Sequence, residues 1–505
     1  MAAKTLMVMG THSNAGKSIL VTALCRLFAR AGMRVAPFKA QNVALNSGVT
    51  PDGREIGRST LIQAEAAGVV PRAEMNPLLI KPEGPGSQIV LEGRVFGRMD
   101  ATNWQSLKPE LWSRITVCFD RLREDYDLVI LEGIGGPAEI NLKRAGEDIA
   151  NMGMAQYAGA PVLLVGDISL GGVFAQLVGT MVLLEPEERA LVKGFIINKL
   201  HGDARLLGDG LEMLRERAFG VPTLGVIPFL RDIGVAAEDS ASLDDRQSPR
   251  DGSRELTIAV LRLPHLSNFD DFDPLAAEPG VEVRFVDRAE DLEDLEGVDA
   301  VILPGTKATL IDLAWLRRTG LADRILRLAA RGTPVVGICG GYQMLGRSLS
   351  DPEGVEAEPG AEAPGLGLLD LDTTFLRTKR TERVEGVLRA ACGPFAELAG
   401  TPVRGYEIHM GRSPVREAEQ SALCEIGQGE GRRLDGSVGE TGAVWGTYLH
   451  GFFENDALRH QWLRSLGWQG RGRAFDREQA YDRLADHVRA HLDMDALERI
   501  VNQGV

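Results

Sequence analysis

Nine residues near the N-terminus, GTHSNAGKS at 10–18, could bind the phosphates of ATP. They follow an apolar run and precede a helical pattern, and backbone N–H groups at such a helix start attract anions. The lysine of this motif reaches the terminal phosphates and its serine hydroxyl binds Mg²⁺, so Lys17 and Ser18 are the candidates. The other residues expected to contact phosphate are Gly10, Thr11, Asn14, Ala15 and Gly16. Compared with the usual phosphate-binding loop, one extra residue separates the first glycine from Gly-Lys-Ser.

Two polar residues that end apolar runs could complete this nucleotide site. Glu132 closes YDLVILEG, which would place a carboxylate at a strand end, where it could join Ser18 around Mg²⁺. A surface glutamate is the alternative, and the glycine-rich turn that follows argues against it because such turns let a backbone approach a ligand. Asn198 in FIINK could read an adenine edge or simply cap a strand turn.

A second set of residues could hydrolyse an amide. Cys339 in PVVGICGGYQMLG lies between an apolar run and a helical pattern and is flanked by glycines, which is typical of a nucleophile elbow. The N–H of Gly340 and backbone N–H groups near Gly305, in VILPGTKAT, could stabilise a tetrahedral oxyanion. We interpret the other cysteines as small core residues: Cys25, Cys118, Cys392 and Cys424.

The thiol also needs a base. His450 in VWGTYLHGFF could take the thiol proton and later help to hydrolyse a thioester. His409 in GYEIHMG is a second candidate, although a histidine that holds the loop or lines the domain interface explains it at least as well.

Alternating apolar runs and helical patterns predict the elements that carry these residues. Strand and helix patterns alternate from the N-terminus to about residue 235, become polar over 236–254, and restart at 255. We therefore predict an α/β protein with two domains, 1–235 and 255–505, joined by a linker at 236–254. The first is expected to be a doubly wound parallel sheet.

Composition excludes several classes of protein. The 505 residues are 44% hydrophobic and carry a net charge of −15, which argues against nucleic acid or an anionic membrane surface as the main partner. No stretch approaches the ~20 apolar residues of a membrane span. Five scattered cysteines without a CxxC pair suggest neither a disulfide framework nor a zinc site. We expect a cytoplasmic protein, and whether it forms a homo-oligomer is left open.

Longer sequence blocks identify a family. The loop pattern G-T-x-S-x-A-G-K-S resembles dethiobiotin synthetase-like enzymes, many of which use ATP to activate a carboxylate. The Cys339 region resembles class I glutamine amidotransferases, whose fold is flavodoxin-like. More narrowly, blocks in this order resemble the cobyric acid synthase family: PFKAQNVALNS (37–47), MNPLLIKP (75–82), EGIGGPAEINL (132–142) and DIANMGMA (148–155). The resemblance extends over essentially the whole chain.

The family resemblance implies the reaction and its substrates. ATP with Mg²⁺ would convert the b, d, e and g carboxylates of adenosylcobyrinic acid a,c-diamide into acyl phosphates, and ammonia from L-glutamine would then form amides. The corrinoid is the substrate, and no bound organic cofactor is expected. Asp148 would orient the nucleophile or accept its proton. Donors suited to carboxylate or phosphate oxygens are Lys39, Gln41, Asn42 and Asn46. Each of these five could instead be a loop residue bonded to backbone.

One position departs from the amidotransferase pattern. Many class I glutaminases carry a glutamate two residues after the histidine, where this chain has Phe452, and Glu454 is too far along to replace it. We therefore predict a dyad of Cys339 and His450, with the histidine steadied by a backbone carbonyl.

Three rival functions are considered. Cobyrinic acid a,c-diamide synthase has the same two-domain plan and chemistry. The KAQNVALNS block instead favours the family that acts on the a,c-diamide, the cobyric acid synthases. Amidating ligases of cell-wall precursors usually divide the two activities between chains. A ParA/MinD-like partition ATPase would have no use for Cys339, Gly305 and His450.

Overall fold

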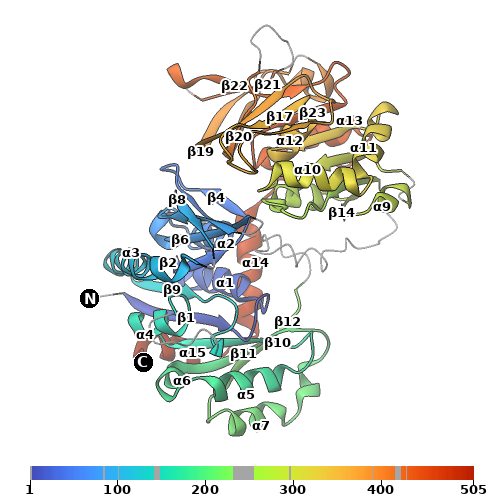
Figure 1. Ribbon diagram of the computed structural model, residues 1–505. Coiled ribbons are helices and arrows are strands. Elements are labelled where there is room, and N and C mark those ends of the chain that lie inside the picture. Colours follow the sequence, from blue (N-terminus) through green and yellow to red (C-terminus); the bar gives the residue numbers. More distant parts are fainter. Residues whose placement is uncertain are drawn as a thin grey trace. The chain divides into compact units, whose positions relative to one another are not determined.

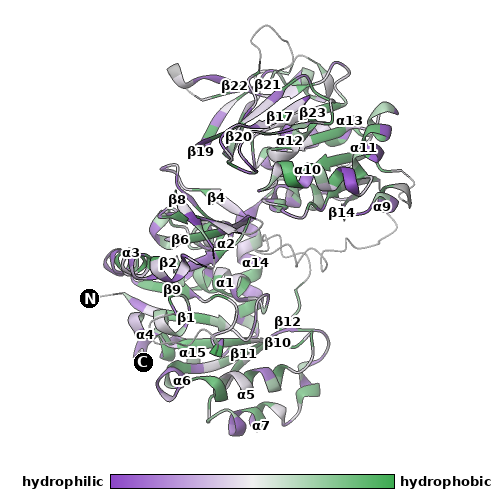
Figure 2. Cartoon of the chain, viewed as in Figure 1, coloured by the Kyte–Doolittle hydropathy of each residue, from purple (hydrophilic) through white to green (hydrophobic). Residues whose placement is uncertain are grey.

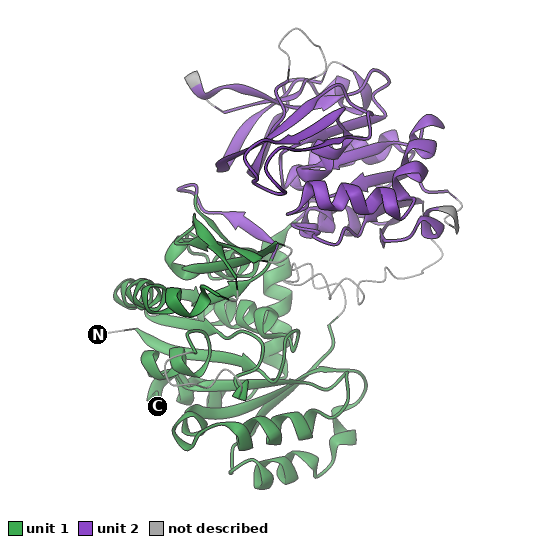
Figure 3. Ribbon diagram, in the orientation of Figure 1, with its two compact units in different colours: residues 1–44, 54–239, 476–505 green, residues 45–53, 240–475 purple. Residues whose placement is uncertain are grey.

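The computed structural model describes residues 3–83, 86–100, 102–140, 148–230, 255–294, 297–390, 392–415, 422–427 and 429–505. The chain divides into two compact units (Figure 3). The first unit comprises Met1–Ala44, Arg54–Asp239 and Asp476–Val505, and the second comprises Leu45–Gly53 and Ser240–Phe475. The predicted linker at 236–254 lies outside the described residues.

The first unit is built around a parallel sheet with strand order β12-β11-β10-β1-β9-β2 (Figure 1). Its strands are β1 (Lys4–Gly10), β2 (Val35–Phe38), β9 (Leu128–Glu132), β10 (Val162–Asp167), β11 (Val192–Leu200) and β12 (Thr223–Pro228). Most of their residues are buried, and Figure 2 shows hydrophobic colouring along them. Continuous apolar runs of this kind are typical of a parallel sheet covered on both faces.

Helices cover both faces of this sheet. Leu6 and Val8 of β1 pack in one hydrophobic core and Met7 and Met9 in another, because successive side chains of a strand point to opposite faces. The helices are α1 (Lys17–Arg30), α2 (Arg58–Ala66), α3 (Trp104–Asp125), α4 (Met152–Ala158), α5 (Val173–Leu183), α6 (Pro186–Leu191), α7 (Gly210–Arg217), α14 (Arg477–Ala490) and α15 (Met494–Gln503). The expected doubly wound α/β fold is confirmed.

Smaller elements complete this part of the chain. A side sheet has the order β3-β6-β7-β8, with β3 (Gln41–Val43), β6 (Leu78–Glu83), β7 (Gly86–Leu91) and β8 (Arg94–Met99). Further short elements are β4 (Ser47–Val49), β5 (Glu55–Gly57), η1 (Ala73–Met75) and η3 (Ala204–Leu207). Of these, β4 belongs to the second unit.

The second unit contains a larger mixed sheet. The strand order is β14-β13-β15-β16-β23-β22-β21-β19-β17-β18, and β20 pairs with β19. From β14 to β23 the neighbours are parallel, whereas β22 and β21 continue the sheet in antiparallel fashion. Its strands are β13 (Leu256–Leu261), β14 (Val281–Val286), β15 (Ala300–Leu303), β16 (Val335–Ile338), β17 (Ser348–Asp351), β18 (Ala361–Pro364), β19 (Asp372–Leu388), β20 (Pro402–Arg412), β21 (Ala422–Ile426), β22 (Arg433–Val438) and β23 (Val444–Thr447).

Short helices accompany the parallel part of this sheet. They are η5 (Phe269–Phe272), α8 (Asp273–Ala276), α9 (Ala289–Asp294), α10 (Thr309–Arg318), α11 (Leu321–Ala330), α12 (Gly340–Leu345), η6 (Gly393–Leu398), η7 (Gly429–Gly431), η8 (Phe452–Glu454) and α13 (Asp456–Ser465). In the described part of the chain, no helix is long and apolar enough to cross a membrane.

The C-terminal boundary of the second domain differs from the prediction. Helices α14 and α15 fall in the predicted 255–505 domain but belong to the first unit. Leu484 and Val488 of α14 share a core with Leu24 and Phe28 of α1, and Arg26 forms an ion pair with Asp482 at 2.8 Å. An amphipathic pattern shows that a helix has a buried face but not which sheet it covers, so the sequence could not assign these helices.

Candidate active sites of the two units

The predicted phosphate loop joins β1 to α1 in the first unit. Asn14 and Gly16 adopt left-handed backbone conformations, with φ of 61° and 98°. A side chain at Gly16 would also meet the Asn198 amide, since an added Cβ would lie 2.1 Å from its Nδ2. Glycine is therefore required at position 16 for both its conformation and its lack of a side chain.

Two side chains support this loop from inside. The Lys17 ammonium donates hydrogen bonds to the carbonyls of His12, at 3.0 Å, and Gly135, at 3.2 Å. The Asn198 amide donates to the Ala15 carbonyl at 3.0 Å. This hydrogen bond reaches the phosphate loop, 183 residues away in the sequence, rather than a turn at the end of its own strand. Reading of adenine by this residue stays a prediction.

The structure brings Ser18 and Glu132 together, as the motif predicts for a Mg²⁺ site. The Ser18 hydroxyl donates to Glu132 Oε1 at 2.7 Å, and the Lys39 ammonium lies 2.8 Å from the same oxygen. The other carboxylate oxygen accepts from the Gln63 amide at 2.5 Å. A hydroxyl beside a carboxylate suits a hard divalent cation. Sequence reasoning missed Gln63, because α2 carries no motif.

The remaining polar candidates of the first unit are held within its own structure. Asn42 is buried in β3 against Gly57, where an added Cβ would lie 2.1 Å from the Asn42 Nδ2. Gln41 is half-buried in the same strand, which pairs with β6. Among the described hydrogen bonds of Lys39, Gln41 and Asn42, only that of Lys39 reaches Glu132, the partner of Ser18.

Asn46 was predicted to lie with Lys39, but the structure places it in the second unit. Its side-chain oxygen accepts a hydrogen bond from the backbone N–H of Asn268 at 2.6 Å. Binding of substrate or phosphate by Asn46 stays a prediction. A contact across more than 200 residues has no local sequence signal.

Asp148 precedes α4 and is bonded to backbone. Its Oδ1 accepts from the N–H groups of Ala150, at 2.9 Å, and Asn151, at 2.7 Å, and its Oδ2 accepts from Gly153 at 3.1 Å. This is the loop-residue alternative considered for it. A carboxylate has about four acceptor positions, so these three bonds leave room for one more donor. Its role as a base stays a prediction.

In the second unit, Cys339 occupies a sharp turn between β16 and α12. Its φ of 52° and ψ of −109° are strained for a residue with a side chain, as expected of a nucleophile elbow. Two close approaches make the turn possible. A Cβ on Gly341 would lie 1.9 Å from the Leu303 carbonyl oxygen, and one on Gly337 would lie 2.6 Å from the Tyr342 Cα.

The predicted oxyanion residues lie beside this turn. An added Cβ on Gly340 would be 3.1 Å from the Thr306 backbone nitrogen, and one on Gly305 would be 3.1 Å from the His450 Cε1. The structure therefore brings Gly305, Gly340 and His450 together, as the sequence predicts. Stabilisation of an oxyanion by their N–H groups stays a prediction.

The turn that contains Gly305 is held by a buried carboxylate, which the sequence did not reveal. Asp312 in α10 accepts a hydrogen bond from the Thr306 hydroxyl, and its Oδ1 lies 2.8 Å from the His265 Nδ1. The hydrogen bond to Asp312 raises the pKa of His265. Two loops near the nucleophile are thus fixed by one side chain.

His450 is paired with a second carboxylate, Asp271, that the sequence also did not reveal. The His450 Nδ1 lies 2.7 Å from Asp271 Oδ2, and the Gly451 N–H donates to Asp271 Oδ1 at 2.8 Å. Burial opposes the charged imidazole, but the charges of Asp271 and Cys339 outweigh it and raise the pKa of His450 to about 10. The expected backbone carbonyl is therefore replaced by a carboxylate partner.

His409 has a different environment from His450. It is buried, its Nδ1 lies 2.7 Å from the Gly411 carbonyl, and its ring stacks on Tyr448 with centroids 3.8 Å apart. Burial lowers the pKa of His409, so this ring is neutral near pH 7. These contacts hold the ring within the second unit, and a catalytic role for His409 stays a prediction.

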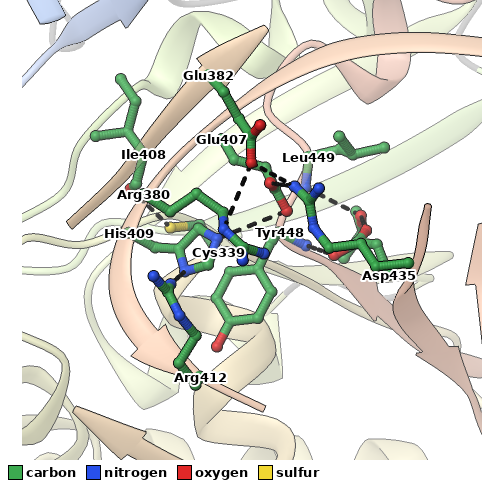
Figure 4. Close-up of polar contacts among 12 residues, drawn as sticks. Cys339, Arg380, Glu382, Glu407, Ile408, His409, Arg412, Asp435, Tyr448 and Leu449 are labelled. Atoms are coloured by element: carbon green, nitrogen blue, oxygen red, sulfur yellow. Dashed lines mark hydrogen bonds and ion pairs between the residues drawn. The ribbon is translucent and has the colours of Figure 1, made fainter. Parts of the chain in front are cut away.

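A cluster of charged residues lies near Cys339 (Figure 4). We call it the charged cluster, and it consists of Arg380, Glu382, Glu407, Arg412 and Arg433. Arg433 pairs with Glu382 at 2.6 Å and also with Glu407. Arg412 donates instead to uncharged groups, the Thr378 carbonyl at 3.1 Å and the Gly411 carbonyl at 3.4 Å.

Comparison with known proteins agrees with this pair of sites. Residues 6–243 match the CobQ/CobB/MinD/ParA nucleotide-binding domain family, and residues 257–458 match the CobB/CobQ-like glutamine amidotransferase domain family. A nucleotide-binding domain fused to such an amidotransferase domain defines a glutamine-hydrolysing carbon–nitrogen ligase. The class of enzyme predicted from the sequence is confirmed.

Full-length relatives narrow this class. A protein called cobyric acid synthase from Dehalococcoides mccartyi is 48% identical to this chain, and the match covers 100% of this chain and 99% of the relative. A protein of the same name from Chloroflexus aurantiacus is 50% identical to it, over 100% of both chains. A third, from Desulforudis audaxviator, is 51% identical over 99% of this chain and 100% of the relative. The chain belongs to the cobyric acid synthase family, whose members act in cobalamin biosynthesis.

Proposed function

We propose that this enzyme amidates the b, d, e and g carboxylates of adenosylcobyrinic acid a,c-diamide, using one ATP and one glutamine for each amide. The observation that carries the proposal is the presence, in one chain, of a loop with Ser18 beside Glu132 and of an elbow cysteine beside His450. The first set suits phosphoryl transfer and the second suits amide hydrolysis.

Activation of the carboxylate is assigned to the first unit. A substrate carboxylate oxygen attacks the γ-phosphorus of ATP, ADP leaves, and an acyl phosphate forms. Lys17 binds the terminal phosphates, while Ser18 and Glu132 would hold Mg²⁺, which supplies positive charge to the phosphate oxygens. Ammonia then attacks the acyl carbon, phosphate leaves, and Asp148 accepts the proton.

Ammonia is supplied by the second unit. The Cys339 thiolate attacks the side-chain amide carbon of glutamine, and N–H groups near Gly305 and Gly340 stabilise the oxyanion. His450 gives a proton to the departing ammonia, and water then hydrolyses the thioester to glutamate. Asp271 keeps the imidazole oriented and charged.

The decisive experiment offers the intact protein its acceptor. With ATP, Mg²⁺ and glutamine, we expect the enzyme to convert the a,c-diamide into a product with four further amides. Mass spectrometry of the product measures the number of amides formed. Cobyrinic acid, the acceptor of the sister enzyme, should not be amidated at its a and c positions. Amidation of cobyrinic acid alone would establish a,c-diamide synthase instead, and no amidation of any corrinoid would refute the proposal.

The charged cluster gives a prediction for glutamine binding. We expect Arg412 to bind the α-carboxylate of glutamine, because its described acceptors are uncharged and it shares β20 with Ile408, whose carbonyl lies 3.7 Å from the Cys339 Sγ. Arg412→Ala should raise the KM for glutamine about 10- to 100-fold with a small change in kcat. Ammonium-dependent amidation should be unaffected. Arg404→Ala, at an exposed position of the same strand, is the control, and an unchanged KM would contradict the assignment.

Asp271 gives a prediction about pH. A carboxylate beside His450 stabilises the imidazolium and raises its pKa, so Asp271→Asn should lower that pKa from about 10. The protonated imidazole is needed to release ammonia, so the alkaline limb of the glutaminase pH profile should move to lower pH. Measurement of glutamate release between pH 6 and pH 11 tests this, and an alkaline limb at the same pH in both proteins would exclude a role for Asp271.

A further inference from the structure

A short segment of the N-terminal part of the sequence folds with the second unit. Residues 45–53 contain β4, and Val49 packs in a small buried core with Tyr406 and Ile408 of β20. The Arg383 guanidinium of β19 also donates to the Val49 carbonyl at 2.6 Å. Figure 3 shows this segment in the colour of the second unit. Asn46 therefore folds with the second unit rather than with Lys39.

Asn46 makes a reciprocal contact with Asn268. The Asn268 N–H donates to the Asn46 side-chain oxygen at 2.6 Å, and the Ser47 N–H donates to the Asn268 side-chain oxygen at 3.1 Å. Both asparagines are buried. Asn268 has a left-handed backbone with φ of 53°. Residues other than glycine, asparagine and aspartate rarely adopt this conformation, so the identity of residue 268 helps to fix the turn that holds its N–H.

Two routes lead from Asn268 to His450. In the first, the Asp271 N–H donates to the Asn268 carbonyl at 3.1 Å, and Asp271 binds the His450 ring at 2.7 Å. In the second, the Asn268 amide donates to the Tyr406 hydroxyl at 3.2 Å. The Tyr406 ring stacks on His450 with centroids 5.2 Å apart, and the two residues also exchange backbone hydrogen bonds.

We infer that Asn46 is a positioning residue for glutamine hydrolysis, which fixes the turn of Asn268 and thereby the Asp271 carboxylate against His450. This inference rests on the proposed glutaminase activity. Removal of the Asn46 side chain leaves the Asn268 N–H without this acceptor and allows the turn to shift. Small shifts of a catalytic group are costly, and a displacement of about 1 Å can reduce a rate about 100-fold.

The test uses the full-length enzyme and the release of glutamate from glutamine. Asn46→Ala should lower the glutaminase kcat about 10-fold or more with little change in KM, and should move the alkaline limb in the same direction as Asp271→Asn. Ammonium-dependent amidation of the a,c-diamide should be retained. Asn103→Ala, which removes the side-chain oxygen that accepts from the Asp100 N–H before α3, is the matched control and should leave both rates unchanged.

A double variant separates positioning from a general loss of structure. If Asn46 acts through Asp271, Asn46→Ala should cause little further loss of kcat in the Asp271→Asn protein, whereas independent effects would multiply. Asn268→Gly removes the same reciprocal contact while keeping the left-handed backbone accessible, and it replaces Asn46→Ala if that variant does not fold.

Three results would overturn the inference. The first is an unchanged glutaminase kcat in Asn46→Ala or Asn268→Gly. The second is a double variant in which the losses of kcat caused by Asn46→Ala and Asp271→Asn multiply. The third is loss of the ammonium-dependent reaction in Asn46→Ala, which would assign Asn46 to the ATP-dependent chemistry. A wild-type protein that releases no glutamate would instead refute the proposed function itself.

Discussion

Replacement of Cys339 by alanine should abolish glutamine-dependent amidation and leave ammonium-dependent amidation intact. The expected loss with glutamine is at least about 1,000-fold, because a covalent route has no substitute once its nucleophile is removed. Ammonium supplies ammonia directly, so the ATP-dependent chemistry of the first unit continues. The two rates are measured on the a,c-diamide with each nitrogen source.

The controls for this variant use another cysteine of the same unit. Cys392 is half-buried, and its thiol donates a hydrogen bond to the Gly439 carbonyl. Cys392→Ala should keep both activities. Persistence of glutamine use in Cys339→Ala would refute its role as nucleophile. Loss of the ammonium reaction as well would mean that Cys339 is also needed for amide formation.

Replacement of Glu132 by glutamine should have the opposite pattern. Amidation should fall about 100-fold or more with either nitrogen source, since the variant loses the charge that faces Ser18 and would hold Mg²⁺. Glutamate release from glutamine alone should continue, because Cys339 and His450 belong to the other unit. Phosphate release and amide formation are measured together.

The Glu132 variant also carries a cost in stability that must be separated from catalysis. Lys39 and Glu132 are both buried, and removal of one charge from a buried pair typically costs about 3–5 kcal/mol. Lys17→Met removes the phosphate-binding ammonium without breaking this pair and should reproduce the kinetic loss. Glu187→Gln at an exposed site is the matched control. Normal amidation by a folded Glu132→Gln protein would exclude Glu132 from the ATP site.

The opposite effects of the Cys339 and Glu132 variants follow from the division of the chain. One unit is predicted to form ammonia and the other to consume it, so each variant should remove one half-reaction and spare the other. A single protein that lost both half-reactions on either substitution would instead point to strict coupling of the two chemistries.

Local sequence determined the chemical groups of both sites. The phosphate loop and the cysteine elbow were predictable because each is a strand, a glycine turn and a helix start that are contiguous in the chain, so nearby residues fix their geometry. Ser18 and Glu132 were also predicted to meet, because the ends of parallel strands in one sheet share an edge.

Tertiary structure alone decided which distant residues support those groups. Gln63, Asp271 and Asp312 lie in short elements without a motif. Their partners Glu132, His450 and His265 are 69, 179 and 47 residues away along the chain. Asn46 was assigned to the wrong unit, and α14 and α15 to the wrong domain, for the same reason. Hydrophobic periodicity and motif spacing report which face of an element is buried and what a loop can bind, whereas the partner of a buried carboxylate, amide or helix face is set by how the chain returns on itself in space.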